Sequence, residues 1–488
     1  MSSLLSPALP KDRKTRKSPG GVEANYSPPS DETRQENRAI RRGFSWLAAG
    51  NVVNAACSWG RLALLARVGN AEMIGQLTLA LAVCKPIGDF ADIGLCGSLI
   101  SDATRQFRLR DYLSLRFLTC GLSLLVIVAT VAAGAYDAAT TRLIVLAGIL
   151  IACESMCDIF QAVLQREERM HWVAISLIVR GLLGLALFGL LVLLTHNLTV
   201  GALGYCIATL ATLVVIDVPR ALICEKQPTN SHLKSQISNL RFQIVKSPPI
   251  ASAGPVIIAR DEARKRTLFR LAWVSLPLGL ATASLSLTTS IPRYWISARL
   301  GNEALGGFAV AGSLMIAMSY VVGALSQAAC PRLARYHAAG NRAAFLRLLG
   351  RLALWLAVLT VVSVVGMAVC GRLAIRLLFG SAFVPYTAVA TCLMLAAGLR
   401  NFSILLGRAI TSMRRFRTGL GLRLLGIVVL VLMLPGWIAW LGLLGAAWAI
   451  SLSWLITTLL SLAVILRFLE CGDKSPHSKE ISGFPCRG

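Results

Sequence analysis

The sequence ARVGNAEMIG at residues 66–75 recurs as ARLGNEALGG at residues 298–307, with five of the ten positions identical. Each copy follows a long apolar stretch and precedes another. The same spacing places Arg61 in register with Arg293. Two copies in the same setting indicate that the chain consists of two related halves.

The composition is that of a membrane protein. Hydrophobic residues make up 56% of the chain, charged residues only 15%, and the mean hydropathy is +0.67, so the apolar content exceeds what one soluble core needs. A helix of about 20 residues crosses the roughly 30 Å hydrocarbon layer. About twelve such stretches lie between residues 44 and 466, which predicts an all-α polytopic membrane protein with about 12 transmembrane helices.

The net charge of +26 raises the alternative of a nucleic-acid-binding protein. The position of the charges argues against it: if the N-terminus is cytoplasmic, most of the 49 Lys and Arg fall in cytoplasmic segments. This distribution follows the positive-inside rule. The sequence therefore predicts a multi-pass membrane protein with both termini cytoplasmic and no nucleic-acid partner.

The spacing of the two copies also fixes the expected organisation. An even number of spans separates them, so the two halves run in the same direction and are related by an axis along the membrane normal. We expect a disordered cytoplasmic tail, an N-lobe of six helices, a cytoplasmic linker, a C-lobe of six helices and a second cytoplasmic tail, at residues 1–43, 44–222, 223–267, 268–467 and 468–488 respectively.

Cysteine and histidine give no sign of a metal site. Most of the thirteen cysteines lie in apolar stretches, where Cys acts as a small apolar residue, and no CxxC pair occurs. Cys153 and Cys157 share a helix face, but no histidine lies nearby in the sequence. We therefore expect no metal, cofactor or disulfide.

Four segments carry a family resemblance: GRLALLARVGNAEMIG (60–75), FADIGL (90–95), IPRYWISARLGNEALGGFAVAG (291–312) and LLFGSAF (377–383). In order and spacing the chain resembles the polysaccharide (O-antigen, Wzx-type) flippases of the multidrug/oligosaccharidyl-lipid/polysaccharide exporter superfamily. The resemblance extends from about residue 44 to residue 466. The long N-terminal tail and central linker depart from the family pattern.

The resemblance implies a V-shaped pair of lobes, a cleft that opens alternately to each side, and a lipid-linked sugar as cargo. The expected function is an inner-membrane flippase for undecaprenyl-pyrophosphate-linked oligosaccharide units in polysaccharide or lipopolysaccharide biosynthesis. It is a transport function and not an enzymatic one. Expected partners are the lipid-linked oligosaccharide, membrane lipids, and a polysaccharide polymerase or glycosyltransferases.

Ionisable residues within spans are costly and mark functional positions. Lys85, Asp89 and Asp92 stand at i, i+4 and i+7, on one face of the second span. One interpretation is a self-neutralising Lys85–Asp89 pair with Asp92 at the headgroups. The other is a polar stripe that lines a wet cleft. Pro86 is expected to loosen this helix.

Glu154 and Asp158 stand one turn apart on the fourth span. Two neighbouring carboxylates raise each other's proton affinity, which suits proton coupling. The structural alternative is an ion pair between Glu154 and Arg180 of the next span. With Asp89, these two residues form the predicted ion-coupling set.

Arg61, Lys85, Arg293 and Arg400 are the predicted substrate-binding residues, because cationic groups would hold the pyrophosphate. Arginine suits this best, since its guanidinium can bind phosphate oxygens with two parallel hydrogen bonds. Arg61 and Arg293 would converge on one pyrophosphate if the first and seventh helices flank the cleft. Alternatively, each bonds within its own lobe. Arg400 either binds phosphate or ties helices together.

Three other functions remain open. A multidrug or cation antiporter of the same superfamily would favour acidic residues in its cleft. A membrane enzyme acting on lipid-linked sugars would need a sizeable outer loop or an acidic metal motif, and the chain has no DxD. A scaffold of polysaccharide assembly is the third.

Overall fold

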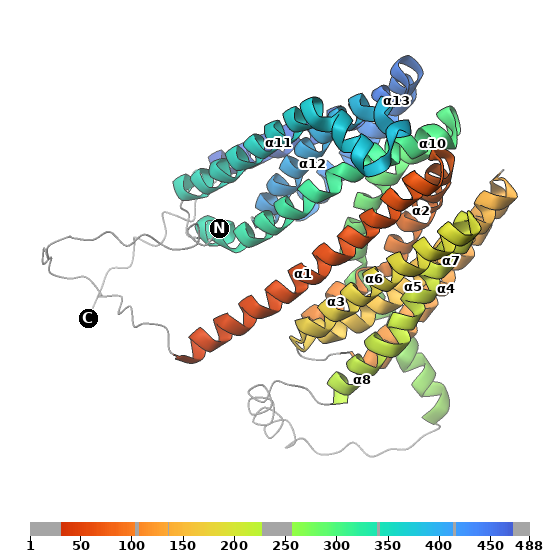
Figure 1. Cartoon of the computed structure of the whole chain (residues 1–488). Helices are drawn as coiled ribbons and strands as arrows, with labels where there is room; N and C mark the ends of the chain where they lie inside the picture. Colours follow the sequence, from red (N-terminus) through yellow and green to blue (C-terminus); the bar gives the residue numbers. More distant parts are fainter. Residues whose placement is uncertain are drawn as a thin grey trace, which may run out of the picture.

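A computed structural model describes residues 31–102, 107–134, 136–226, 256–338, 342–412 and 416–471. Within these ranges the chain is helical and contains no strand (Figure 1). The predicted all-α polytopic membrane fold is confirmed.

The first half contains α1 and α2, the short α3, the long helices α4, α5 and α6, and α7, which continues through a π-helix, η2, into α8. Their bounds are Asp31–Val68, Ala71–Asp92, Leu95–Ser101, Leu109–Ala133, Ala138–Arg166, Met170–Thr195, Leu198–Thr212, Leu213–Asp217 and Val218–Lys226.

The second half contains α10, α11, a short 3-10 helix η3, α12 and α13, with bounds Val256–Ala338, Arg342–Phe379, Ser381–Tyr386, Thr387–Ser412 and Phe416–Cys471. Two of these helices bend sharply, α10 at Gly301 and α13 at Gly442. When their arms are counted separately, the described residues contain twelve long helical arms, six in each half.

Seven segments of the described chain are long and apolar enough to cross a membrane by length and composition. They comprise α4, α5, α6, α7 with α8, α11, η3 with α12, and α13. Because α13 contains two arms, these seven segments account for eight of the twelve arms. The remaining four are α1, α2 and the two arms of α10, which carry most of the polar contacts described below. The protein is thus a multi-pass membrane protein.

The repeated motif marks a change of chain direction in both halves, but the two copies differ in detail. Gly69 donates from its amide to the Leu65 carbonyl and ends α1, and Asn70 caps α2 by accepting from the Met73 amide at 2.8 Å. In the second copy Gly301 has a φ of 85°, a conformation that costs glycine little. There the Asn302 side chain accepts from the Ser297 hydroxyl at 2.8 Å, and Gly301 but not Gly69 has a positive φ, so the two copies reverse the chain with different local geometry.

The two turns also lie against each other, at the upper right of Figure 1, where α1 meets α2 and where α10 bends. We call this the turn end of the molecule. A Cβ added to Gly75 would overlap the Asn302 carbonyl oxygen, and one added to Gly306 would overlap that of Ala71. The backbones of the two copies thus approach closely because glycine stands at each contact.

The first arm of α10 runs antiparallel along α2 beyond this turn. Gly279 packs against the backbone of Ile93 near the other end of α2. Midway, the Tyr294 hydroxyl donates to the Ala82 carbonyl at 2.7 Å. That carbonyl is the one that Pro86, which lacks an amide proton, leaves without its i+4 donor. The helix continues through Pro86 and ends at Asp92, before Ile93 and Gly94, both of positive φ. Pro86 therefore removes one intrahelical hydrogen bond without ending α2.

The ends of several helices differ from the predicted segments. Helix α1 begins at Asp31, inside the expected disordered tail. Acidic residues at the start of this helix and helix-forming residues after them favour a helix here. Likewise α8 and α10 extend into both ends of the expected linker, and α13 reaches Cys471. The remainder of the predicted tails and linker, residues 1–30, 227–255 and 472–488, lies outside the described residues. The lobe boundaries stay a prediction.

Candidate functional site

A polar cavity of about 460 Å³ lies between α2, α3, α5 and the first arm of α10. This volume is within the range of small-molecule sites, about 300–1,000 Å³. Its ionisable lining consists of one lysine and four carboxylic acids, namely Lys85, Asp89, Asp92, Glu154 and Asp158. Four of the seven predicted site residues therefore meet here: Lys85, Asp89, Glu154 and Asp158.

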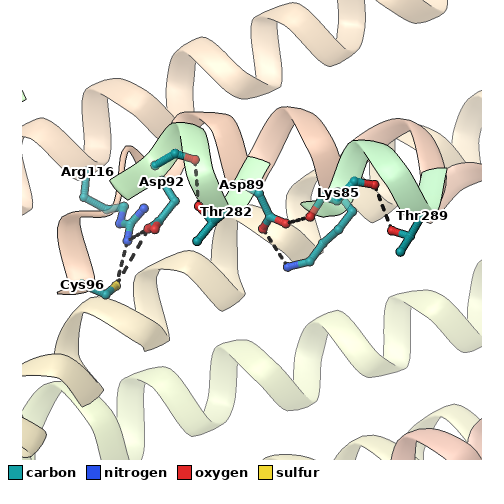
Figure 2. Close-up of polar contacts among 9 residues, drawn as sticks. Lys85, Asp89, Asp92, Cys96, Arg116, Thr282 and Thr289 are labelled. Carbon is teal, nitrogen blue, oxygen red and sulfur yellow. Dashed lines mark hydrogen bonds and ion pairs between the residues drawn. The ribbon is translucent and has the colours of Figure 1, made fainter. Parts of the chain in front are cut away.

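Lys85 and Asp89 are both paired and part of the cavity wall. The Lys85 Nζ lies 3.0 Å from an Asp89 carboxylate oxygen, one helical turn away. The second Asp89 oxygen accepts from the Ser286 hydroxyl of α10. Figure 2 shows Lys85 and Asp89 turned toward each other along α2. Both predicted interpretations of this stripe hold for Lys85 and Asp89, which pair and face the cavity.

Asp92 does not lie free among headgroups. It forms an ion pair with Arg116 of α4, whose side chain is 1% exposed. Arg116 also contacts the Cys96 sulfur at 3.0 Å, and Figure 2 shows all three gathered at the end of α2. The sequence analysis did not single out this pair. The available signal was an arginine within the apolar run LSLRFLTC at 113–120.

Glu154 and Asp158 follow each other along α5 and both face the cavity. Glu154 accepts a hydrogen bond from the Tyr205 hydroxyl at 2.8 Å. Asp158 has an exposed side chain, which opens onto the cavity. In the part of the chain that the structure describes, it is the one carboxylate of the cavity without a hydrogen-bond or ion-pair partner.

Glu154 and Arg180 form no ion pair within the described residues. Glu154 instead accepts the hydrogen bond from Tyr205. The Arg180 side chain is nevertheless buried on α6 and lies within electrostatic range of both Glu154 and Asp158. Its Nε and Nη1 atoms lack hydrogen-bond partners in the described structure. Arg180 therefore places positive charge behind the two carboxylates.

Arg61 is turned into its own lobe, away from the predicted meeting with Arg293. Its guanidinium lies 3.9 Å above the Tyr205 ring and donates to the Ser58 hydroxyl at 3.0 Å. Gly184 of α6 makes room, because a Cβ there would press on the Tyr205 ring. Arg61 is thus joined to Glu154 through Tyr205, and the alternative of bonding within one lobe describes it better.

Arg293 and Arg400 do not line this cavity. Arg293 stands on the first arm of α10, next to Tyr294. Arg400 stands on α12 beside Asn401, whose buried amide has no hydrogen-bond partner among the described residues. The structure therefore separates the predicted set into an ionic cavity and two distant arginines.

Polar groups continue from the cavity into the interior of the first half. Gln161 lines the cavity and donates to the Ser176 hydroxyl at 3.1 Å. Both lie near Asp217, a fully buried acid at the end of the π-helix η2. Such π-helical turns are rare and often occur at functional sites. Asp217 was missed, although a single acid in the apolar run LATLVVIDVP was its signal.

The charges of the two halves differ. The cavity wall has four carboxylates and one ammonium, and the guanidinium groups of Arg116 and Arg180 behind it offset part of the negative charge. The wall itself therefore favours bound cations or protons over phosphate. Between residues 268 and 467 the sequence contains one acid, Glu303, among many arginines. An anionic group would find its counter-charges in the second half.

Comparison with known proteins agrees with this architecture. Residues 40–244 match a family of proteins described as "Polysaccharide biosynthesis protein". The chain is 21% identical over 414 residues to the "Capsular polysaccharide biosynthesis protein CapF" of Staphylococcus aureus, which covers 84% of this chain and 96% of that protein.

Solved structures show the same fold. A multidrug resistance MATE family transporter of the MOP superfamily, in an outward-facing conformation, gives a TM-score of 0.59 at 12% identity over 90% of this chain and 96% of that chain. An inward-facing structure of such a transporter also gives 0.59, at 13% identity over 88% and 96%. Since the two scores are equal, the likeness shows the fold and not the conformational state.

The fold is therefore that of the multi-pass MATE-type membrane transporters. Within that class, the resemblance predicted from the sequence, to the polysaccharide flippases of the multidrug/oligosaccharidyl-lipid/polysaccharide exporter superfamily, is confirmed by the family match, the capsular relative and the common fold.

Proposed function

We propose that the protein is a flippase that moves undecaprenyl-pyrophosphate-linked oligosaccharide units across the bacterial inner membrane, with both termini cytoplasmic, for polysaccharide or lipopolysaccharide biosynthesis. The match of residues 40–244 to the polysaccharide biosynthesis family is the observation that carries the cargo class. Transport requires no covalent chemistry, so we assign no catalytic residue. A polymerase or glycosyltransferases that make and use the cargo are the proposed protein partners.

Proton or cation binding in the cavity is the proposed source of energy. Asp158 is open to the cavity and has a second carboxylate, Glu154, one turn away. Close carboxylates favour bound protons, and protonation alters the charge balance around Lys85 and Asp89. Asp89 also contacts Ser286 of α10, so a change in its charge acts directly on the packing between α2 and α10.

The pyrophosphate is proposed to bind in the second half, at Arg293 and Arg400. Glu303 is the one acid in the sequence between residues 268 and 467, so positive charge predominates in the part of the chain that carries Arg293 and Arg400, and guanidinium groups bind phosphate oxygens with paired hydrogen bonds. Lys85 fits the coupling site better than the cargo site, because it pairs with Asp89 inside an acidic cavity. The sugar would cross through water while the prenyl chain stays in lipid.

A second candidate function is export of organic cations, and the acidic cavity favours it. Four carboxylates around a space of about 460 Å³ suit a small hydrophobic cation. In that case Asp158 and Glu154 would bind cargo directly. The two functions differ in this respect: an exporter would bind an organic cation at these carboxylates in competition with protons, whereas the flippase would not.

The test uses the purified full chain in liposomes with an imposed pH gradient. We expect flipping of a lipid-linked oligosaccharide that depends on the gradient, and loss of that dependence in a Glu154→Gln, Asp158→Asn double variant. Asp137→Asn is the matched control, because it makes the same acid-to-amide change on the loop residue that caps α5.

Unchanged gradient dependence in the well-folded double variant would remove the coupling role. Transport of a fluorescent organic cation in place of the lipid-linked sugar, abolished by the same double variant, would replace the flippase with the exporter.

A further inference from the structure

At the turn end, α1 reaches across to the second half through Arg67. Its guanidinium donates from Nη2 to the Leu377 carbonyl and from Nε to the Leu378 carbonyl, the latter at 3.4 Å. Both carbonyls belong to the last turn of α11, which ends at Phe379. Arg67 therefore caps a helix of the other half.

The end of α11 needs such a cap. The last four carbonyls of a helix have no amide donor within it. The Gly380 amide, at a φ of 101°, bonds the Ile375 and Arg376 carbonyls and leaves those of Leu377 and Leu378. A cation at this position also interacts favourably with the helix dipole. Arg67 thus satisfies two of the terminal carbonyls that the end of α11 does not satisfy itself.

Trp59, about two turns deeper along α1, supports this contact. Its ring meets Phe379 edge to face, with centroids 5.6 Å apart, and its indole N–H donates to the Ser313 hydroxyl at 3.1 Å. Phe379 is fully buried. Residues 59 and 67 are eight apart and share one helix face, so one side of α1 carries both contacts to the second half.

The repeat supplies a natural comparison, because Arg299 holds the position in the second copy that Arg67 holds in the first. Arg299, which is exposed like Arg67, lies 5.5 Å from the centre of the Trp295 ring of its own helix arm. The two arginines occupy equivalent turns, yet in the described structure only Arg67 bonds across the halves.

From these contacts we propose that Arg67 and Trp59, with the glycine contacts of Gly75 and Gly306, form a gate that holds the turn end closed. In the state open at this end, Arg67 leaves the α11 carbonyls and the two turns separate. The role of the gate in transport rests on the proposed alternating-access function. The contacts that form the gate are present without cargo and can be tested in its absence.

Hydrogen–deuterium exchange of the purified full chain in lipid nanodiscs tests the gate without any cargo. We expect Arg67→Ala to raise the exchange rate of amides in peptides covering residues 376–386 by about tenfold or more, since a bond to a charged group is lost. Arg299→Ala should leave the same peptides unchanged. Arg67→Lys keeps the positive charge but lacks the planar pair of donors of the guanidinium, so its exchange rate should lie between those of the wild type and Arg67→Ala.

Equal exchange in Arg67→Ala and Arg299→Ala would overturn the proposal, as would no change in either. If Arg67→Ala does not fold, Arg67→Lys and Trp59→Phe carry the test: faster exchange at residues 376–386 in both supports the gate, and wild-type exchange in both overturns it. Because no cargo is present, failure of the lipid-linked sugar to be transported would count against the proposed function and not against the gate.

Discussion

The two halves of the chain begin from the same turn and differ most in their charges. In the first half, a lysine, four acids and nearby arginines surround one cavity, and most of them are paired. In the second, arginines occur with a single acid between residues 268 and 467. Both halves carry the Gly-Asn pair between their first two helical arms, while their charges differ. Such a difference in charge is expected if the first half binds cations and the second half binds an anion.

The largest expected effect tests whether pairing in the first half is structural. Arg116→Ala leaves Asp92 without its buried partner, and removing one member of a buried pair costs about 3–5 kcal/mol. We expect a marked fall in the thermal unfolding midpoint of the detergent-solubilised protein. Adding Asp92→Asn should recover much of the loss. If Arg116→Ala unfolds like the wild type, charge pairing does not distinguish the halves.

Arginines of the second half should behave in the opposite way. Arg293→Ala and Arg400→Ala each remove a proposed phosphate contact worth about 1.5–3 kcal/mol, or about 10- to 150-fold in transport. Their unfolding midpoints should change less than that of Arg116→Ala. Polysaccharide export at matched expression measures the first effect, and lysine should rescue it only partly. Full export by both alanine variants would place the cargo site elsewhere.

A smaller effect is expected at the contact that joins α2 to α10. Tyr294→Phe removes the donor to the Ala82 carbonyl and should lower stability by about 1 kcal/mol. Pro86→Ala supplies an amide in its place, so the double variant should be more stable than Tyr294→Phe alone. If the stability changes of the two single variants simply add up in the double variant, the amide supplied by Pro86→Ala does not replace the Tyr294 donor.

The smallest effect concerns the acid that caps α5 outside the membrane. Hydrogen bonds from Thr140 and from the amides of Ala139 and Thr140 lower the pKa of the exposed Asp137 carboxyl. A lowered pKa adds stability above the unfolded value, about 3.9, and this stability is lost as the pH falls through the folded value. Asp137→Ala should cost about 0.5–1 kcal/mol at pH 7, with a smaller difference at pH 3. A difference that grows on acidification would have the wrong sign.

Helical periodicity and hydropathy predicted the features that depend on neighbouring residues. The stripe of Lys85, Asp89 and Asp92 and the pair Glu154 and Asp158 face the cavity because positions three or four apart share a helix face. The family resemblance was also within reach, because the motifs span both halves in order.

Features that depend on distant partners were not predictable in this way. The direction of Arg61 depends on the space at Gly184, and the Ala82 carbonyl receives its donor from Tyr294 of α10. Asp92 meets Arg116 only because α4 packs beside α2. Spacing along one helix fixes a face, but the neighbour that this face meets is set by the packing of the whole bundle.

The bond from Tyr294 to Ala82 has a consequence for how the protein is made. The donor follows its acceptor by 212 residues, so α2 is synthesised and inserted well before Tyr294 leaves the ribosome. An unpaired carbonyl in hydrocarbon costs several kcal/mol. During that interval the Ala82 carbonyl must bind water or another donor, and it receives the Tyr294 hydroxyl only when α10 arrives. A first half translated alone should therefore stay a substrate for membrane quality-control proteases until the second half docks.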